Sequence, residues 1–266
     1  MSTIHFNQWF HALLDRPASA APTAQLFCFP YAGAGPSSYH AFCKALPAHI
    51  LPFVARLPGR ETTRHLPALT DLHDIVTQLA RAIRPALDRQ PVFFWGHSMG
   101  ALVAFEVARL LGPQLGPRRL IVSGHKAPQM PLRPRPVPVT EMNDAQFIDL
   151  LQSYGGMPQA VLDNPEVLQL LLPQLKADFM ALDRYRYVPG ERLECGILCV
   201  NGESDRLVAE PQALAWREQT RGGFGCKWLP GAHFFINESR PALVRIIDET
   251  IAEELVRLEA DLPEGH

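Results

Sequence analysis

A serine in a short glycine-flanked motif is the residue best placed to do chemistry. Residues 96–100 read Gly-His-Ser-Met-Gly, with Ser98 at the centre. The apolar run 92–95 precedes the motif and the helix-like stretch 101–111 follows it, which is the strand, turn and helix order of a nucleophile elbow. The tight turn pushes the hydroxyl out above the sheet, and the N-terminus of the helix favours developing negative charge. The motif predicts that Ser98 attacks an acyl carbonyl.

A serine hydroxyl needs a base that takes its proton and an acid that orients the base. The base that we predict is His233, in the loop 230–235 that follows the last strand-like run. Two other histidines fit less well, because His97 lies inside the elbow with its side chain expected to point into the fold, and His125 precedes the candidate acids in the chain. The remaining histidines lie on early or terminal segments and are His5, His11, His40, His49, His65, His73 and His266.

Two acidic residues follow the strand-like run 197–201 and could orient the histidine. Asp205 is better placed to turn back toward the sheet, whereas Glu203 is nearer the strand end and is the alternative. Either could instead be a turn residue that caps a helix starting near Pro211. The presence of Ser98 favours a catalytic acid over a capping residue, with Asp205 as the first choice.

An acyl-transfer site also needs two backbone amides that stabilise the oxyanion of the tetrahedral intermediate. Met99, the residue after the nucleophile, is expected to supply one amide. The other is expected from the small-residue loop 30–35, with Ala32 as the first choice and Tyr31 as the alternative. This loop lacks the Gly-Lys-Ser/Thr ending of a phosphate loop.

The elements that must position these residues alternate between strands and helices. Short apolar runs without polar alternation are typical of strands buried on both faces, as in parallel sheets. Such runs occupy residues 26–29, 50–55, 92–95, 120–123, 197–201 and 226–229. Apolar residues spaced at three and four predict helices over 72–87 and 243–258. The alternation predicts a single doubly wound α/β domain over residues 1–266, with a mostly parallel sheet.

One stretch, residues 126–190, breaks the alternation. A proline-rich entry is followed by two amphipathic patterns, over 147–154 and over 168–182, and Pro173 is expected to kink the second. These helices could be ordinary core packing or a lid over an acyl pocket. Their place after the fourth strand, above the edge where Ser98 is expected, favours a helical lid.

Composition excludes several other classes of protein. The chain has 266 residues, a net charge of −2 and 47% hydrophobic residues, which suits a packed core and does not indicate a nucleic-acid surface. Its five cysteines have neither metal-ligand nor disulfide-framework spacing, so we expect reduced thiols in a cytoplasmic protein without a metal. The first residues lack the pattern of a signal peptide, and no apolar run reaches the roughly 18–20 residues that span a bilayer. A monomer is the default expectation.

With these pieces assembled, the sequence resembles the type II thioesterases of nonribosomal peptide and polyketide synthesis, which have the α/β-hydrolase fold. Two departures from the family pattern are Tyr31, where histidine is common, and Ala232, where a second glycine is usual. The matching segments are 28–35, 57–61, 96–101, 123–124, 154–156, Asp178 with Tyr185, 202–208 and 231–235.

The resemblance implies hydrolysis of acyl thioesters on the phosphopantetheine arm of carrier proteins, so that stalled or mis-primed acyl groups are removed. It implies Ser98 as nucleophile, His233 as base and Asp205 as the acid, with no cofactor. A carboxylesterase, an acyltransferase and a non-catalytic carrier-binding module are the alternatives. Carrier proteins are generally acidic, so basic residues that flank the insertion either form a docking rim or are scattered solvated charges. These are Lys126, Arg133, Arg135, Arg184 and Arg186.

Overall fold

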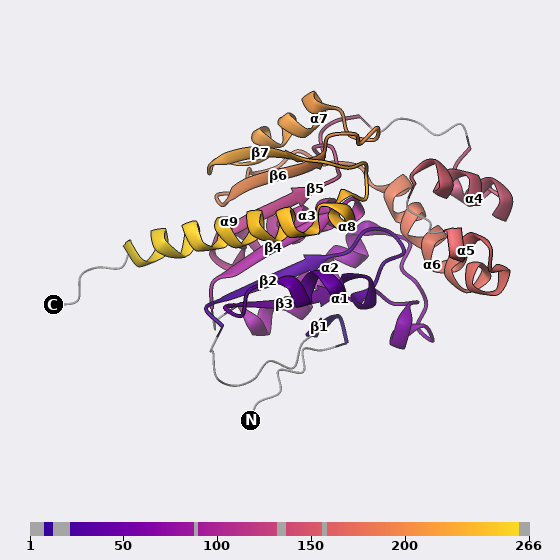
Figure 1. Cartoon of the computed structure of the whole chain (residues 1–266), viewed down its shortest axis with the longest axis horizontal. Coiled ribbons are helices and arrows are strands. Elements are labelled where there is room, and N and C mark those ends of the chain that lie inside the picture. Colours follow the sequence, from indigo (N-terminus) through magenta and orange to yellow (C-terminus); the bar gives the residue numbers. More distant parts are fainter. Residues whose placement is uncertain (1–7, 13–21, 88–89, 132–136, 156–158, 261–266) are drawn as a thin grey trace.

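The computed structural model describes residues 8–12, 22–87, 90–131, 137–155 and 159–260. In these ranges the chain forms a seven-stranded sheet in the order β1-β3-β2-β4-β5-β6-β7, in which only the β1–β3 pair is antiparallel (Figure 1). The strands are β1 (Phe10–Ala12), β2 (Ala24–Phe29), β3 (Ile50–Ala55), β4 (Val92–His97), β5 (Arg119–Ser123), β6 (Gly196–Gly202) and β7 (Phe224–Leu229). The predicted α/β class is confirmed, and the six predicted strands are all present.

The continuous apolar runs are explained by burial on both faces of the sheet. In β4, Val92 and Phe94 belong to one hydrophobic cluster, whereas Phe93 and Trp95 belong to the cluster on the opposite face. Successive side chains of a strand point to opposite faces, so both sets must be apolar. The short antiparallel strand β1 was not predicted, because three residues are too few to show a period.

Helices cover both faces of this sheet. Side chains of α2 and α3 belong to one cluster, and those of α1, α8 and α9 belong to the other. These helices are α1 (Pro36–Ala45), α2 (Leu72–Ile83), α3 (Met99–Leu115), α8 (Phe235–Glu238) and α9 (Arg240–Ala260). The short α7 (Glu210–Leu214) follows β6 in the chain and precedes β7. The predicted helix over 72–87 is α2 followed by a 3-10 turn, Arg84–Ala86.

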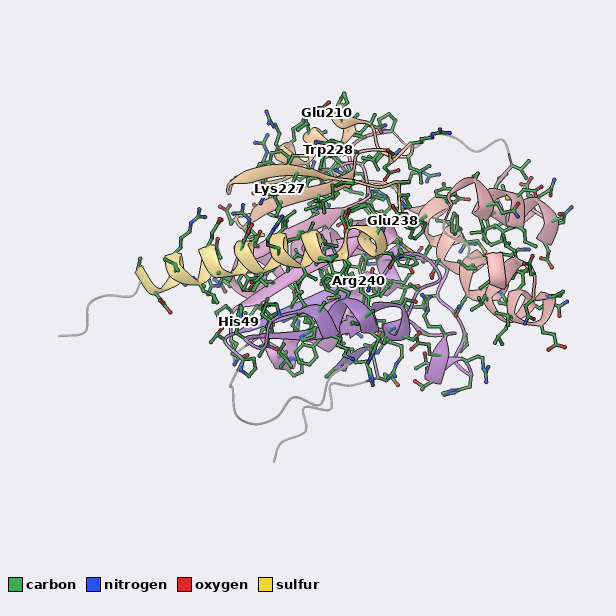
Figure 2. The ribbon with its side chains drawn as sticks, viewed as in Figure 1. His49, Glu210, Lys227, Trp228, Glu238 and Arg240 are labelled. Atoms are coloured by element: carbon green, nitrogen blue, oxygen red, sulfur yellow. The ribbon has the colours of Figure 1, made fainter. Side chains whose placement is uncertain are left out.

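The long helix α9 lies across the sheet and is joined to strands on either side of it. His49, just before β3, forms an ion pair with Asp248 at 3.1 Å, and Lys227 of β7 approaches Glu249 at 3.8 Å. Figure 2 shows His49 and Lys227 on opposite sides of this helix. Such exposed pairs contribute little energy, so apolar packing holds α9 in place. No helix in the described ranges combines the length and apolarity needed to cross a membrane.

The helices described within the insertion 126–190 form a separate group beyond one end of the sheet (Figure 1). It contains the 3-10 turn Val139–Glu141, α4 (Asp144–Ser153), α5 (Gln159–Leu162) and α6 (Pro165–Arg184). Apolar side chains of α4 and α6 form a cluster of their own, which includes Phe147 and Phe179 and contacts Ala32 of the main domain, whereas Ala127 and Ala181 belong to a cluster of the main domain. The helix α6 continues through Pro173 as a single element.

Candidate active site

Ser98 lies on a sharp turn between β4 and α3. Its backbone has φ 53° and ψ −122°, a conformation that non-glycine residues rarely adopt, and its amide donates to Ser123 O at 2.8 Å. A Cβ on Gly96 would lie 2.1 Å from Gly100 O, and a Cβ on Gly100 would lie 1.8 Å from Phe29 O. The two glycines of the motif are therefore required by close backbone contact, as the sequence indicated.

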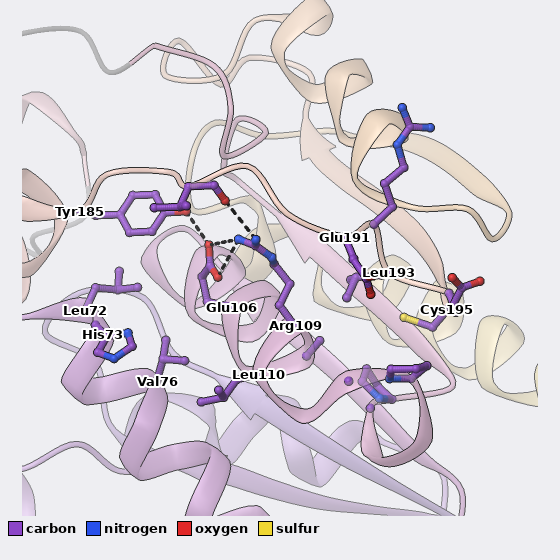
Figure 3. A pocket seen from close by; sticks show the side chains of 18 of the residues that line it. Leu72, His73, Val76, Glu106, Arg109, Leu110, Tyr185, Glu191, Leu193 and Cys195 are labelled. Atoms are coloured by element: carbon purple, nitrogen blue, oxygen red, sulfur yellow. Dashed lines mark hydrogen bonds and ion pairs between the residues drawn. The ribbon is translucent and has the colours of Figure 1, made fainter.

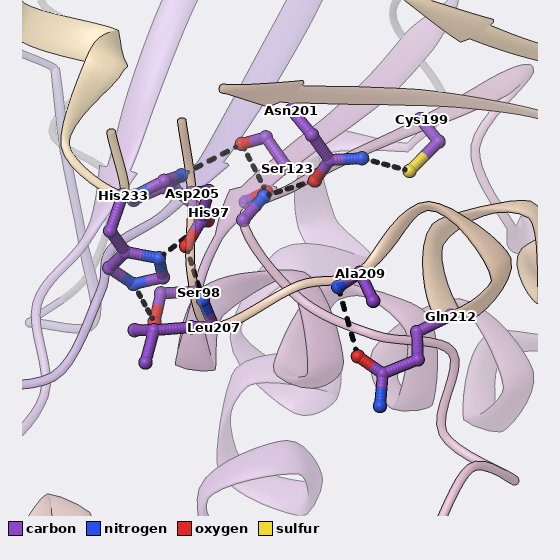
Figure 4. Close-up of polar contacts among 12 residues, drawn as sticks. His97, Ser98, Ser123, Cys199, Asn201, Asp205, Leu207, Ala209, Gln212 and His233 are labelled. Atoms are coloured by element: carbon purple, nitrogen blue, oxygen red, sulfur yellow. Dashed lines mark hydrogen bonds and ion pairs between the residues drawn. The ribbon is translucent and has the colours of Figure 1, made fainter. Parts of the chain in front are cut away.

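The structure brings Ser98, His233 and Asp205 into one chain of hydrogen bonds (Figure 4). The Ser98 hydroxyl lies 3.0 Å from His233 Nε2, and His233 Nδ1 lies 2.9 Å from Asp205 Oδ2. Asp205 Oδ1 accepts from the Leu207 amide at 2.9 Å. His233 and Asp205 are buried and Ser98 is partly exposed, so the hydroxyl is the open end of the chain. Glu203, the alternative acid, is exposed.

Backbone contacts between two loops hold the acid and the histidine together. The Glu203 amide donates to Leu229 O at 2.9 Å, and the Ser204 amide donates to Gly231 O at 3.0 Å. A Cβ on Gly202 would lie 2.4 Å from Ala232 O, so this glycine permits the close approach. The loops after β6 and β7 thus bring together two residues that are 28 positions apart.

The two expected oxyanion donors lie on segments that meet beside Ser98. Met99 is the first residue of α3, where backbone amides have no partner within the helix. The loop after β2 contains a β-turn in which the Ala34 amide donates to Tyr31 O at 3.0 Å and Gly33 has φ 79°, as in a type II turn. Ala32 is the second residue of this turn, whose hydrogen bond does not use its amide.

A buried polar cluster lies directly under the His233 ring. The centre of the His97 ring is 5.2 Å from that of His233, and His97 Nδ1 lies 3.1 Å from the Ser123 hydroxyl. That hydroxyl donates to Gly96 O and accepts from Trp95 Nε1, so we assign the His97 proton to Nδ1. Burial and then the nearby His233 ring lower the pKa of His97 well below 6.5. His97 is thus a neutral residue inside the fold, as predicted.

The other internal histidine, His125, is also held neutral. Burial lowers its pKa to about 4, and its Nδ1 lies 2.6 Å from Lys126 O. Neither His97 nor His125 is hydrogen-bonded to Ser98 in the structure.

The insertion reaches the site through aromatic contacts. The Tyr154 ring, at the end of α4, lies 6.3 Å from the His233 ring and 5.6 Å from the Phe179 ring of α6. Apolar side chains of the insertion therefore border the reactive group.

A buried ion pair beside the loop 30–35 was not predicted from the sequence. Arg60 Nη2 lies 2.7 Å from Asp178 Oδ1, and both side chains are almost completely buried. Asp178 was noted only as part of the family pattern. Asp178 shares the apolar face of α6 with Leu175, Phe179 and Leu182, which indicates a buried carboxylate. A buried carboxylate needs a partner, so this pattern could have predicted an ion pair.

A cavity of about 740 Å³ lies away from the triad, between α2, α3 and the segment that follows α6 (Figure 3). Glu106 and Arg109 form an ion pair at 3.1 Å inside it, and the Tyr185 hydroxyl donates to Glu106 at 2.6 Å. Arg184 and Arg186 line this cavity, and their guanidinium groups bind Thr70 and backbone carbonyls.

The other basic residues that flank the insertion are described only in part. Lys126 donates to Pro131 O at 2.6 Å. Arg133 and Arg135 lie outside the described residues. Of the five basic residues, the three that are described make contacts within the chain.

The sheet is mostly parallel, and a strained strand-to-helix turn carries a serine that is hydrogen-bonded to a histidine, which in turn is hydrogen-bonded to a buried aspartate. These features define the class of α/β-hydrolases that use a serine. The chain belongs to the thioesterase domain family, whose model matches residues 24–251. The resemblance found in the sequence is therefore confirmed.

Individual relatives cover nearly the whole chain. It is 37% identical over 243 residues to the gramicidin S biosynthesis protein GrsT of Aneurinibacillus migulanus, covering 91% of this chain and 93% of GrsT. Two solved structures are also similar. The type II thioesterase BorB from the borrelidin biosynthetic cluster is 31% identical with a TM-score of 0.81, covering 92% of this chain and 98% of BorB. The type II thioesterase YbtT from the yersiniabactin pathway is 30% identical with a TM-score of 0.80, covering 92% and 99%.

Proposed function

We propose that this thioesterase hydrolyses acyl thioesters on the phosphopantetheine arm of carrier proteins and so clears stalled or mis-primed units in nonribosomal peptide or polyketide synthesis. The observation that carries the proposal is the hydrogen-bonded chain from the Ser98 hydroxyl through His233 to Asp205. Similarity to type II thioesterases over nearly the full length supports the substrate class.

The first half of the proposed reaction forms an acyl-enzyme. Ser98 Oγ attacks the thioester carbonyl as His233 Nε2 takes its proton, and Asp205 stabilises the imidazolium. The amides of Met99 and Ala32 bind the oxyanion, where loss of one donor costs a factor of about 10²–10³ in kcat. The carbon–sulfur bond then breaks, and His233 gives its proton to the leaving thiolate of the pantetheine arm.

The second half regenerates the enzyme with water. His233 takes a proton from a water molecule, and the resulting hydroxide attacks the acyl-serine carbonyl. The intermediate collapses, the carbon–oxygen bond to Ser98 breaks, and His233 returns the proton to Ser98 Oγ. The products are the free acid and a carrier protein with its thiol restored. No step requires a metal or a redox cofactor.

Helices α4, α5 and α6 are proposed to act as a lid over the acyl group. The Tyr154 contact with His233 and the contact of the insertion cluster with Ala32 support this role. We further propose a cytoplasmic monomer, for which the five free cysteines and a set of reactive residues drawn from one chain are the supporting observations.

The test is mass spectrometry of a panel of acyl-loaded carrier proteins after incubation with the wild type or with Ser98→Ala. We expect the wild type to release free acids and Ser98→Ala to lower kcat by about 10⁴-fold or more, because the nucleophile is lost. The corresponding free esters serve as comparison substrates. A large preference in kcat/KM for the ester would contradict the proposal in favour of a carboxylesterase, and acyl transfer to an added alcohol or amine would indicate an acyltransferase.

A non-catalytic carrier-binding module is distinguished by covalent labelling. A fluorophosphonate should modify Ser98 in the folded wild type and should not modify Ser98→Ala. Carrier binding by a folded protein that resists labelling would support the binding module.

A further inference from the structure

The turn that carries Ala32 is held by polar side chains from two distant parts of the chain. Asp178 of α6 accepts from the Gly33 amide through Oδ2 at 2.7 Å and from Arg60 through Oδ1 at 2.7 Å. Arg60 also donates to Ala34 O at 2.9 Å. Arg60 is 2% exposed and Asp178 is 1% exposed. The ion pair thus binds the turn through one backbone donor, the Gly33 amide, and one backbone acceptor, Ala34 O.

Further contacts fix the turn against α6 and α1. Gln174 Nε2 approaches Gly33 O at 3.3 Å, and a Cβ on Gly33 would lie 2.2 Å from the Leu175 side chain. Glu61, next to Arg60, accepts from the amide of Ser37 at 2.9 Å near the start of α1. The two residues that follow Ala32 are therefore held by side chains from outside the turn, while the turn's own hydrogen bond leaves the Ala32 amide unused.

We propose that the Arg60–Asp178 pair is a positioning device that holds the Ala32 amide where the oxyanion develops. This inference rests on the proposed function, because it assumes that Ala32 is an oxyanion donor. A donor stabilises a transition state only when it is held in place before the reaction, since misplacement by about 1 Å can cost a factor of about 100. A buried ion pair gives a single rigid arrangement, because neither group can turn to water.

The first test replaces the carboxylate by an amide of the same shape. In Asp178→Asn one oxygen remains for two donors, the Gly33 amide and Arg60, so one of them faces an NH₂ group. We expect kcat to fall by about 10- to 100-fold with KM for the acyl carrier changed by less than about twofold. The inhibition constant of an alkyl trifluoromethyl ketone, whose adduct with Ser98 carries an oxyanion, should rise by the same factor.

A second variant separates positioning from stability. The double substitution Arg60→Met with Asp178→Leu removes both buried charges, so thermal stability should recover relative to Asp178→Asn. Because Gly33 and Ala34 still lack their partners, kcat and ketone affinity should stay low. Recovery of kcat together with stability would overturn the proposal, since the pair would then be purely structural. If Asp178→Asn does not fold, Gln174→Met replaces it in the test, because this variant removes only the contact with Gly33 O. We then expect smaller losses of kcat and of ketone affinity, again with little change in KM.

The matched control is Glu106→Gln, which disrupts a different ion pair that does not touch the turn. It should lower stability and leave kcat and ketone affinity unchanged. Equal losses of kcat in Glu106→Gln and Asp178→Asn at matched stability would overturn the proposal. Ser98→Ala distinguishes a failure of the proposed function from a failure of the proposed positioning role. If Ser98→Ala retains activity, the proposed function fails. If it is inactive while Asp178→Asn has wild-type kcat and ketone affinity, only the positioning role fails.

Discussion

Asp205 uses both of its carboxylate oxygens, and this orients the imidazole. One oxygen lies 2.9 Å from His233 Nδ1, and the other accepts from the Leu207 amide at 2.9 Å. The backbone amide holds the carboxylate in the orientation that presents an acceptor to Nδ1. Under the proposed mechanism this selects the tautomer in which Nε2 is free to take the serine proton.

We predict that Asp205→Asn lowers kcat by about 10⁴-fold with little change in KM. The amide can donate to Nδ1, which places the ring proton on Nε2 and removes the base from Ser98. Steady-state kinetics on an acyl carrier protein measures the effect. Glu203→Gln is the control, because this exposed acid lies in the same loop, and it should retain wild-type kcat. The reverse result, a large loss in Glu203→Gln alone, would assign the role to the alternative acid.

Tyr31 illustrates how a departure from the family pattern is accommodated. Its ring packs edge-on against Phe234 at 5.1 Å and against His97 at 5.9 Å. Burial raises the pKa of its hydroxyl, so the side chain is neutral. The tyrosine therefore forms part of an aromatic wall beside the histidine loop, and it does not introduce a second base.

Among the elements of the fold, the helix α4 of the insertion packs against fewer buried side chains than the strands of the sheet do. The strands of the sheet lie between two large clusters of buried side chains, whereas α4 packs in the smaller separate cluster around Phe147 and Phe179. Elements with few buried neighbours open locally at a lower free energy than the whole protein. A lid that opens for substrate would need this property.

We predict that Asn143→Ala accelerates hydrogen exchange in α4 and leaves β4 unchanged. Asn143 Oδ1 accepts from the Gln146 amide at 2.9 Å, and Gln146 Oε1 accepts from the Asn143 amide at 3.0 Å, which together form a capping box. Loss of this cap should lower the local opening free energy by about 1 kcal/mol. Mass spectrometry of peptides from both elements gives the measurement. Equal acceleration in α4 and β4 would mean that the insertion unfolds only with the whole domain.

At its other end the insertion is tied to the main domain. Tyr185, directly after α6, donates to Glu106 of α3, and Arg109 donates to Val188 O at 3.0 Å (Figure 3). Together with the Arg60–Asp178 pair, these contacts fix the C-terminal half of α6. If the insertion acts as the proposed lid, we therefore expect its motion to be concentrated in α4 and α5.

At the scale of the whole molecule, buried histidines make stability depend on pH. His125 has a pKa of about 4 in the folded protein against 6.5 when solvated, and the pKa of His97 is lowered in the same direction. Between pH 6.5 and 4 the unfolded chain binds protons that the folded chain does not, so the free energy of unfolding falls as the pH is lowered through this range.

We predict that His125→Asn reduces this acid sensitivity. The pKa difference of His125 corresponds to about 3 kcal/mol, which is present above pH 6.5 and lost by pH 4. Asparagine keeps a donor for Lys126 O and does not titrate. Urea denaturation at pH 7 and pH 4 should therefore show a smaller difference in the variant by about this amount. An equal loss of stability in both proteins would show that His125 does not contribute to the pH dependence.

Features that depend on local backbone geometry could be predicted from the order of amino acids alone. Two glycines around Ser98 permit the elbow, and uninterrupted apolar runs identify strands with two covered faces. Chain order on an α/β sheet then placed the acid after the fifth predicted strand and the histidine after the sixth, because parallel strands present their C-terminal ends at one edge, and position in the loop favoured Asp205 over Glu203. Such features can be predicted from short-range patterns, provided that the strands that precede the site residues run in the same direction.

The orientation of side chains whose partners are far away in the chain became known only from the packing of the folded protein. Arg60 and Asp178 are 118 positions apart, and no periodicity could pair them. Likewise, Arg184 and Arg186 line the cavity beside α3, and this placement follows from the path of the chain after α6. Local patterns specify how a segment folds, whereas the contacts of buried charged groups depend on how distant segments pack together.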